Sequence, residues 1–351
     1  MTIHPKLRLS ATTTATGISY SDIREMMIHF AKEREKPLLE NTDTQLSISL
    51  MDGVMTFHAP DDDLTVTVTV SADQPDMLHM LKNVFLIFTE RSAPETAARV
   101  RWDDGVESGG LPPNFRFITV QSVTRVGADF LRVQARSNEL DSLGDSSIHF
   151  RLVLPPKGVD KVKWPHVGEN GGSVWPTGDA ALHRPVYTIR RIDHGAGLME
   201  FDIFEHDGGR ATEWARTAGK GDLVGLVGPA GSGVPDTREI LMFADETAIP
   251  AAARILESLP DDTTGHIVMV AQNGKDCGYP LTLPPGVSAE WKSGDFRDAL
   301  ADHAIAMHDE KPDHYFWFAG EKAAVQKIRA AYRDKGGDPA RSYIAAYWSA
   351  E

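Results

Sequence analysis

The chain has 351 residues, which is enough for more than one hydrophobic core, so two or three domains are expected. Hydrophobic residues at 41% and charged residues at 25% are typical of folded globular proteins and exclude bulk disorder. The sequence carries 36 Lys and Arg against 50 Asp and Glu, a formal net charge of −14. This balance argues against nucleic acid as the main partner, because phosphate backbones are bound by basic surfaces.

Cysteine content and apolar runs bear on the compartment. The single cysteine, Cys277, excludes an internal disulfide framework and a cysteine-ligated iron–sulfur cluster. No run approaches the ~18 apolar residues of a membrane span, and the N-terminus lacks the apolar core of a signal peptide. The sequence therefore predicts a soluble, cytoplasmic protein with no membrane span.

The first segment, residues 11–102, is predicted to be a small α+β domain of unknown function. Residues 21–33 and 74–91 carry apolar side chains at helical spacing, whereas residues 46–50 and 64–70 alternate as strands do. Its histidines, His29, His58 and His79, lack the clustered spacing of metal ligands and are interpreted as structural. No metal site is predicted.

A polar stretch rich in glycine and proline, residues 103–113, is the predicted linker. Residues 114–235 then carry short alternating runs at 115–126, 130–135, 148–154, 186–190, 198–204 and 223–227. Several short strands at close spacing predict an antiparallel β-barrel. A long loop rich in glycine and proline, residues 155–179, interrupts them.

The third segment, residues 236–351, has a different hydrophobic pattern. Buried-strand runs at 240–244, 267–271 and 315–319 alternate with helical patterns at 248–259 and 321–335, and 343–348 closes the chain as a strand. Strands that alternate with helices predict an α/β domain with a parallel sheet, the common platform for nucleotides. The whole chain is thus expected to be multidomain, combining α+β and α/β parts.

Residues 184–190 read Arg-Pro-Val-Tyr-Thr-Ile-Arg and carry one candidate for cofactor chemistry. The planar guanidinium of Arg184 suits a pyrophosphate. The ring of Tyr187 can pack on a flat heterocycle, and the hydroxyl of Thr188 can hydrogen-bond its edge. Taken alone, the segment fits equally well an ordinary barrel strand with solvated arginines and a packed tyrosine.

Two further patterns suit anionic ligands. Residues 202–215 read as a strand, a glycine turn and a helix N-terminus, with Thr212 placed to cap the helix or to contact an anion. Residues 244–250 open from a strand into a helix through Asp245 and Thr247, with Thr247 as the predicted N-cap. An ordinary capped helix is the alternative at the second place. A Gly-Asp to Gly-Pro strand at 221–229 is interpreted as structural.

In this order the motifs resemble the siderophore-interacting protein family, flavin-dependent ferric-siderophore reductases of the ferredoxin-reductase-like group. The resemblance covers about residues 115–348. It implies an FAD-binding barrel followed by an NAD(P)H-binding domain. Arg210 stands where the family has proline, and the end of the chain, Ala346 to Glu351, lacks the family's terminal arginine. The segment ahead of the linker resembles an uncharacterised domain found fused to such proteins.

The resemblance assigns cofactor binding residue by residue. The implied positions are Arg184, Tyr187, Thr188, Asp202, Phe204, His206, Ala211, Thr212, Trp214, Asp245, Thr247, Tyr347 and Trp348. No side chain is assigned as catalytic, because the flavin performs the chemistry.

The implied activity is transfer of electrons from NADPH or NADH through FAD to the Fe(III) of a siderophore, which releases the iron. A ferredoxin is the alternative donor. Two other hypotheses remain: a flavin reductase or diaphorase with another acceptor, and a non-catalytic flavin- or siderophore-binding protein. Basic candidates for holding an anionic chelate, with solvated surface charge as the alternative, are Lys157, Lys161, Lys163, Lys292 and Arg297.

Overall fold

The computed structural model describes residues 7–33, 36–50, 52–59, 63–144, 146–159 and 161–350. It divides into two compact units. The first unit combines residues 1–116 with 155–182, and the second combines residues 117–154 with 183–351. The long loop predicted inside the barrel region therefore belongs to the first unit. The domain boundaries predicted at 103, 114 and 236 stay predictions.

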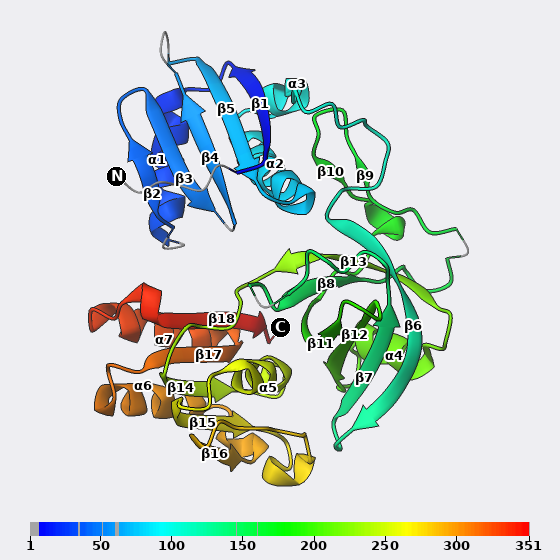
Figure 1. Cartoon of the computed structure of the whole chain (residues 1–351), viewed down its shortest axis with the longest axis vertical. Helices are drawn as coiled ribbons and strands as arrows, with labels where there is room; N and C mark the ends of the chain where they lie inside the picture. The colour runs from blue at the N-terminus through cyan, green and yellow to red at the C-terminus, as the bar shows by residue number, and fades with distance from the viewer. Residues whose placement is uncertain are drawn as a thin grey trace. The chain divides into compact units, whose positions relative to one another are not determined.

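A five-stranded sheet forms the N-terminal part of the first unit (Figure 1). Its strand order is β1-β5-β4-β3-β2, with every neighbouring pair antiparallel. The bounds are β1 (Leu9–Thr16), β2 (Leu38–Asn41), β3 (Gln45–Leu50), β4 (Gly53–His58) and β5 (Thr65–Ala72). β5 shows how the pattern works, because Val66, Val68 and Val70 are fully buried while the threonines between them are half-buried.

Two helices cover the buried face of this sheet. α1 (Tyr20–Glu33) and α2 (Pro75–Ser92) contribute side chains to one core with the strands, so both pack on the same face. A short α3 (Pro94–Arg99) follows. The predicted α+β class and both helices are confirmed. The sequence patterns missed β1, β2 and β4; in β1 the apolar residues beyond Leu9 are only alanines and therefore give little contrast.

The excursion at 155–182 contains a small ribbon rather than loop alone. β9 (His166–Val167) and β10 (Ser173–Val174) pair antiparallel, and a 3-10 turn, η1 (Gly178–Ala180), follows. Gly171 turns the ribbon with φ +76°, a backbone conformation that favours glycine.

The closed barrel has the strand order β11-β12-β7-β6-β13-β8. Its strands are β6 (Phe115–Val126), β7 (Phe130–Arg136), β8 (His149–Val153), β11 (Val186–Asp193), β12 (Leu198–Phe204) and β13 (Leu223–Ala230). Each one coincides with a predicted run, so the antiparallel barrel is confirmed. Fully buried side chains such as Val133, Leu152 and Phe201 fill its interior, and closure gives each strand two neighbours.

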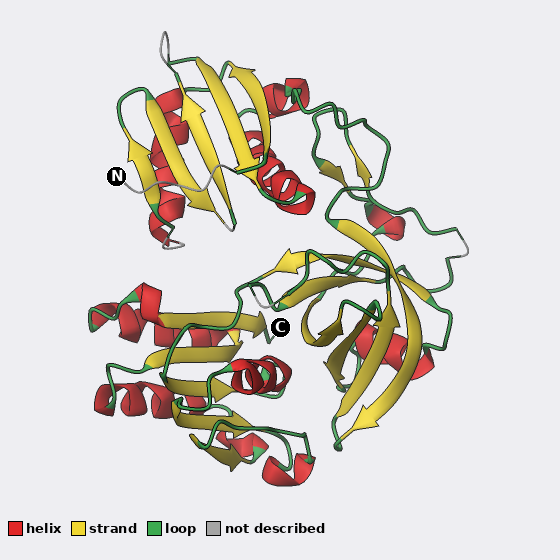
Figure 2. Ribbon diagram, in the orientation of Figure 1, coloured by secondary structure: helices red, strands yellow, loops and turns green. Residues whose placement is uncertain are grey.

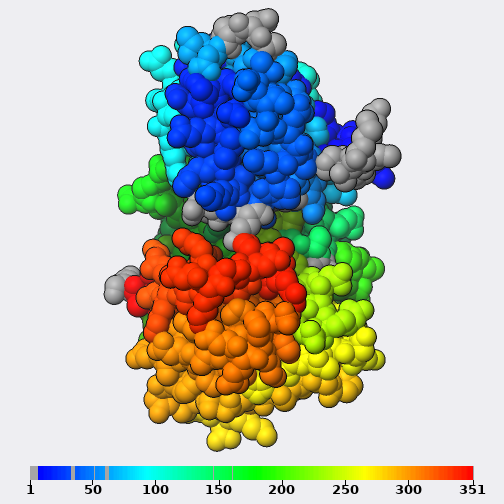
Figure 3. Space-filling model, turned by 90° about the vertical axis from the view of Figure 1, so that its left-hand side faces the viewer, coloured from blue at the N-terminus to red at the C-terminus, as the bar shows by residue number. Residues whose placement is uncertain are grey.

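The C-terminal sheet is parallel throughout, in the order β16-β15-β14-β17-β18. Its strands are β14 (Glu239–Ala244), β15 (Thr264–Val270), β16 (Gly286–Lys292), β17 (Tyr315–Glu321) and β18 (Ser342–Trp348). α5 (Ile249–Ser258) covers one face, and α6 (Leu300–Glu310) with α7 (Lys322–Asp334) covers the other (Figure 2). Figure 3 shows the outer surface over α6 and α7 in orange and red.

Burial on both faces explains why β14 reads as a continuous apolar run. Residues 240–244 are all fully buried, with alternate side chains in the cores under α5 and under α6 and α7. The predicted α/β class is confirmed, although α6 and β16 were not predicted. Among the residues described above, no helix is both long enough and apolar enough to cross a membrane.

Candidate functional site

A change of partner along β11 opens the barrel wall beside the predicted flavin motif. Val186 to Thr188 pair with β8, whereas pairing with β12 begins at Ile189. On β12, residues 202–204 pair with β7 and, within the described ladders, not with β11. Backbone groups on these two facing edges therefore lie outside the ladder. Such groups need hydrogen-bond partners, which the edge of a planar ligand can supply.

Tyr187 and Thr188 lie at this open edge. Tyr187 is half-buried, and its ring centroid lies 5.9 Å from that of Phe201. Burial raises the pKa of Tyr187 above its usual value, so its phenol stays protonated. Thr188 is buried, and its hydroxyl oxygen lies 3.3 Å from Nδ1 of His149. The strand thus presents one aromatic ring and one fixed hydroxyl.

His149, on β8, connects this strand to the end of the chain. Its Nε2 lies 3.1 Å from the phenol oxygen of Tyr347 on β18, and the two rings are perpendicular. Burial first, and the charge of Arg254 second, lower the pKa of His149 to about 4. A neutral imidazole has one donor and one acceptor nitrogen, so it can bridge Thr188 and Tyr347. Sequence reasoning missed His149, because no spacing marks it.

The N-terminus of α4 (Arg210–Thr217) forms an open corner near the end of β12. Gly209 is its N-cap and offers no side-chain cap bond to the first-turn N–H groups, which an anion can satisfy. Thr212 was predicted to cap the helix or contact an anion, and the capping part of that prediction is wrong. Its hydroxyl donates to the carbonyl of Phe204 (3.3 Å) and accepts from the amide of His206 (3.4 Å). The Thr212 hydroxyl therefore stabilises the turn between β12 and α4 and does not cap the helix.

Positive charge gathers at the same end of the barrel. Arg184 is exposed, and Nη1 of Arg151 donates to its carbonyl at 3.2 Å. Burial first, and the charge of Arg151 second, lower the pKa of Arg184. Burial and then the charge of Arg210 lower the pKa of the neighbouring His183. Like charges held close together favour an anion at this corner.

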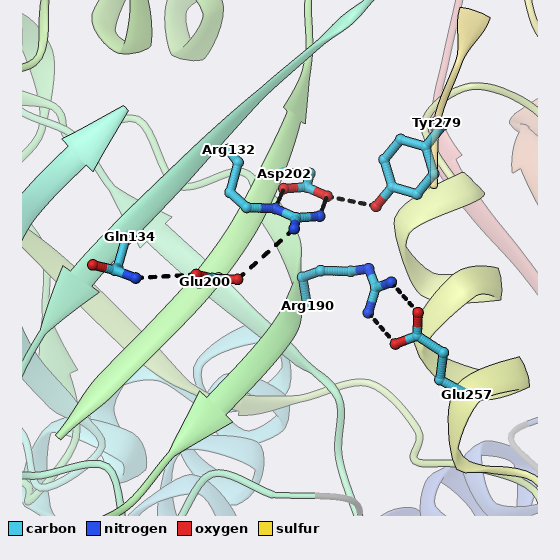
Figure 4. Close-up of polar contacts among 7 residues, drawn as sticks. All are labelled: Arg132, Gln134, Arg190, Glu200, Asp202, Glu257 and Tyr279. Atoms are coloured by element: carbon cyan, nitrogen blue, oxygen red, sulfur yellow. Dashed lines mark hydrogen bonds and ion pairs between the residues drawn. The ribbon is translucent and has the colours of Figure 1, made fainter. Parts of the chain in front are cut away.

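The charged side chains of a second group pair with one another and form a closed network (Figure 4). Asp202 accepts two bonds from Arg132, both at 2.7 Å, and a third from the hydroxyl of Tyr279. Arg190 instead points to Glu257 on α5, with bonds of 2.6 and 2.5 Å. The last arginine of the motif therefore joins the barrel to the α/β part, and no sequence pattern indicated this partner.

Asp245 lies where the α/β sheet reverses its strand order, directly after β14. Its Oδ1 accepts from the amide (3.0 Å) and hydroxyl (2.6 Å) of Thr247, and its Oδ2 accepts from the indole N–H of Trp348 (2.7 Å). Burial raises the pKa of Asp245. The prediction of Thr247 as N-cap is wrong, because Ala248 holds that position and the Thr247 hydroxyl is engaged by Asp245.

Glycine is required opposite Asp245. A Cβ at Gly320, at the end of β17, would lie 2.8 Å from the Asp245 carboxylate oxygen. The ends of β14, β17 and β18 therefore converge on one carboxylate.

The predicted site residues gather in two places in the second unit. Around the open barrel edge and α4 lie Arg184, Tyr187, Thr188, Phe204, His206, Ala211, Thr212 and Trp214. At the carboxyl end of the parallel sheet lie Asp245, Thr247 and Trp348, and Tyr347 connects the two places through His149. Asp202 belongs to the closed network instead.

The candidate substrate cations of the α/β part are engaged by protein groups. Arg297 pairs with buried Glu246 at 2.5 Å. Lys292 pairs with Glu290 at 2.6 Å and lies over the ring of Phe296. Within the described residues, no cluster of three or more His, Cys, Asp or Glu could hold a metal ion.

Comparison with known proteins finds the same two-part arrangement. The siderophore-interacting FAD-binding domain profile matches residues 119–233, and the siderophore-interacting protein profile matches residues 237–351. The NADPH-dependent ferric-chelate reductase of Escherichia coli is 32% identical over 248 residues, which cover 68% of this chain and 94% of that protein. Residues before 119 lie outside both profile matches.

Solved structures agree. The siderophore-interacting protein SipS from Aeromonas hydrophila is 28% identical, with a TM-score of 0.57 over 67% of this chain and 92% of that one. A siderophore utilization protein from T. fusca is 26% identical, with a TM-score of 0.60 over 69% and 95%.

The residues present fit both cofactors. An uncapped helix end beside Arg184 and Arg151 suits a pyrophosphate, and the open edge at Tyr187 and Thr188 suits a planar flavin. The carboxyl end of the parallel sheet at Asp245 is where such folds place a dinucleotide.

Proposed function

The chain belongs to the siderophore-interacting protein family, and from this premise we propose that it reduces the Fe(III) of ferric siderophores with electrons from NADPH or NADH passed through FAD. It is an oxidoreductase that uses FAD and NAD(P)H. The observation that carries the proposal is the open edge between β11 and β12, set beside the uncapped N-terminus of α4.

Each part of the flavin site has its own task in this proposal. Arg184 and the first turn of α4 bind the pyrophosphate, because both offer donors to an anion. Tyr187 packs on the ring system, and Thr188 fixes its edge. When bound, FAD supplies the exchange of an electron pair from NAD(P)H for single electrons to iron.

The chain Thr188–His149–Tyr347 orients the site rather than titrating in it. His149, with a pKa of about 4, is neutral at physiological pH, and burial keeps the phenol of Tyr347 protonated. Both groups can therefore hold the Thr188 hydroxyl in one geometry without a change of charge.

In the proposed site, NAD(P)H binding depends on the loop after β14. Asp245 accepts hydrogen bonds from the Thr247 hydroxyl and from the indole N–H of Trp348, so the end of β18 stabilises this loop. In the absence of the family's terminal arginine, we assign Trp348 the task of positioning the donor site.

Anaerobic stopped-flow spectroscopy tests the proposal. FAD-loaded protein is reduced with NADPH, NADH or a reduced ferredoxin and is then mixed with a ferric catecholate, a ferric hydroxamate or a quinone. We expect NADPH or NADH to bleach the flavin absorbance and a ferric siderophore to restore it faster than a quinone does. Faster re-oxidation by the quinone would identify a diaphorase, and failure to bind FAD would identify a protein without flavin chemistry.

A further inference from the structure

One face of α2 carries polar side chains in a stripe. Asp76, His79 and Lys82 follow one another at spacings of three residues, and Asn83 lies four residues after His79, which places all four on one side of the helix. Asp76 is 7% exposed, and His79 and Lys82 are each 2% exposed. Buried ionisable groups are costly unless they are paired, so this face requires partners.

The ionic partners come from chain that follows the N-terminal sheet. Asp76 pairs with buried Arg116, at the start of β6. Lys82 pairs with Asp104 in the predicted linker, and its ammonium lies over the ring of Trp102. Both ion pairs are largely shielded from water, so breaking either one would leave a buried charge.

The remaining partners come from the β9–β10 ribbon inside 155–182. The side-chain oxygen of Asn83 accepts from the amide of Ser173 at 2.8 Å. Nε2 of His79 lies 2.8 Å from the Ser173 hydroxyl. Burial, followed by the charge of Lys82, lowers the pKa of His79 to about 4, so this contact is between neutral groups at physiological pH.

Close packing accompanies these bonds. A Cβ at Gly172 would lie 2.6 Å from Leu86 of α2, and one at Gly171 would lie 2.7 Å from Trp102. The linker pairs with the ribbon as well, because the amide of Gly109 donates to Val167 and the amide of Val167 donates back to Gly110, both at 2.8 Å. The predicted linker is therefore part of a packed layer rather than a free tether.

Chain connectivity relates this layer to the flavin strand. The 155–182 excursion leaves directly after Leu154 and returns at His183, and paired backbone bonds between these two residues close its base. The next residue is Arg184, which precedes β11. The excursion held by α2 therefore ends two residues before Arg184, the first residue of the flavin motif.

We propose that the polar face of α2 is the binding surface for residues 155–182 of the same chain, and that the N-terminal domain thereby positions the approach to the flavin strand. In this proposal the N-terminal domain acts on the flavin motif through the chain that joins residue 182 to His183, rather than as an independent binding module. The flavin half of this inference rests on the function proposed above; the binding half rests only on contacts within the first unit.

Asn83→Ala in the full chain is the first test. Loss of the Ser173 bond should speed amide hydrogen exchange in residues 166–174 about fivefold and weaken FAD affinity about threefold, because a net hydrogen bond is worth about 1 kcal/mol. Asn41→Ala is the matched control, since Asn41 lies on β2 and accepts from exposed Arg24. It should change neither measurement.

Ser173→Ala tests the contact from the ribbon side and leaves α2 intact if Asn83→Ala misfolds. In a double-mutant cycle the two changes should be clearly less than additive in exchange rate, because they remove the same bond. Unchanged exchange in 166–174 in both variants overturns the binding surface. Faster exchange with unchanged FAD affinity overturns the positioning role. A protein that binds FAD but reduces no ferric siderophore contradicts only the proposed function, because neither readout here uses catalysis.

Discussion

Two groups of arginines in the second unit differ in what surrounds them. Arg132 and Arg190 each meet a carboxylate at hydrogen-bond distance, and together they join strands of the barrel to one another and to α5. Arg184 instead lies near Arg151, whose charge lowers its pKa, beside an uncapped helix. The first group is paired with carboxylates of the chain, whereas in the second two like charges lie close together, an arrangement that an anion stabilises. The motif at residues 184–190 therefore begins with Arg184 of the second group and ends with Arg190 of the first.

Removal of Arg190 should have the largest effect on stability. Arg190→Ala removes a buried guanidinium and its two bonds to the exposed Glu257 carboxylate, and two charge-assisted bonds are together worth about 3 kcal/mol. A lowered urea midpoint would show the loss. Arg191→Ala, at the exposed neighbouring position, should stay within about 0.5 kcal/mol of the wild type. Equal effects of the two substitutions would contradict the closed network.

Acid should expose the contribution of His149, which lies within hydrogen-bond distance of Thr188 and Tyr347. Its pKa is about 4 in the folded protein against an ordinary 6.5, so above pH 6.5 it is uncharged in both states and contributes no pH dependence. As pH falls from 6.5 to 4, the unfolded chain binds a proton that the folded chain does not, and stability falls by on the order of 2 kcal/mol.

His149→Gln should remove that part of the acid loss. Urea midpoints at pH 7, 5.5 and 4 measure it as a difference between variant and wild type. Parallel curves for the two proteins would show that His149 titrates normally when folded.

Removal of Arg184 should affect ligand binding and spare stability. Arg184→Gln should weaken FAD affinity about tenfold, since a hydrogen bond to a charged group is worth about 1.5 kcal/mol, with little change in the urea midpoint. Flavin fluorescence titration measures the affinity, and Arg191→Gln serves as the control. A stability loss as large as that of Arg190→Ala would remove the contrast between the two groups.

The smallest expected effects lie at the end of β18. Trp348→Phe removes the donor to Asp245 and should raise the KM for NADPH about threefold, because the loop that carries Thr247 loses one support. Tyr347→Phe removes the His149 contact instead and should act on FAD affinity. Steady-state kinetics and FAD titration of both variants measure the difference. Identical profiles would show that the two aromatic residues do not act on separate sites.

Much of the fold follows from local sequence patterns. The six barrel strands and three strands of the parallel sheet alternate or run apolar as their burial requires, so period alone indicates them. Some of the missed strands lack such contrast; β16, for example, has only Val287 buried. β4 was missed although buried and half-buried residues alternate along it. The flavin motif was also recognisable by sequence, although its individual residue roles stay proposals.

What the sequence by itself determined is the order of the parts, the type of most elements and the family. Only the tertiary structure decided which side chains meet: His149 with Tyr347, Asp245 with Trp348, and the polar face of α2 with Ser173. The same holds for Thr212 and Thr247, whose hydroxyls turn to other partners than the predicted caps. The physical reason is that these contacts join residues distant in the chain. No local periodicity records them, because strand register and chain crossing bring them together.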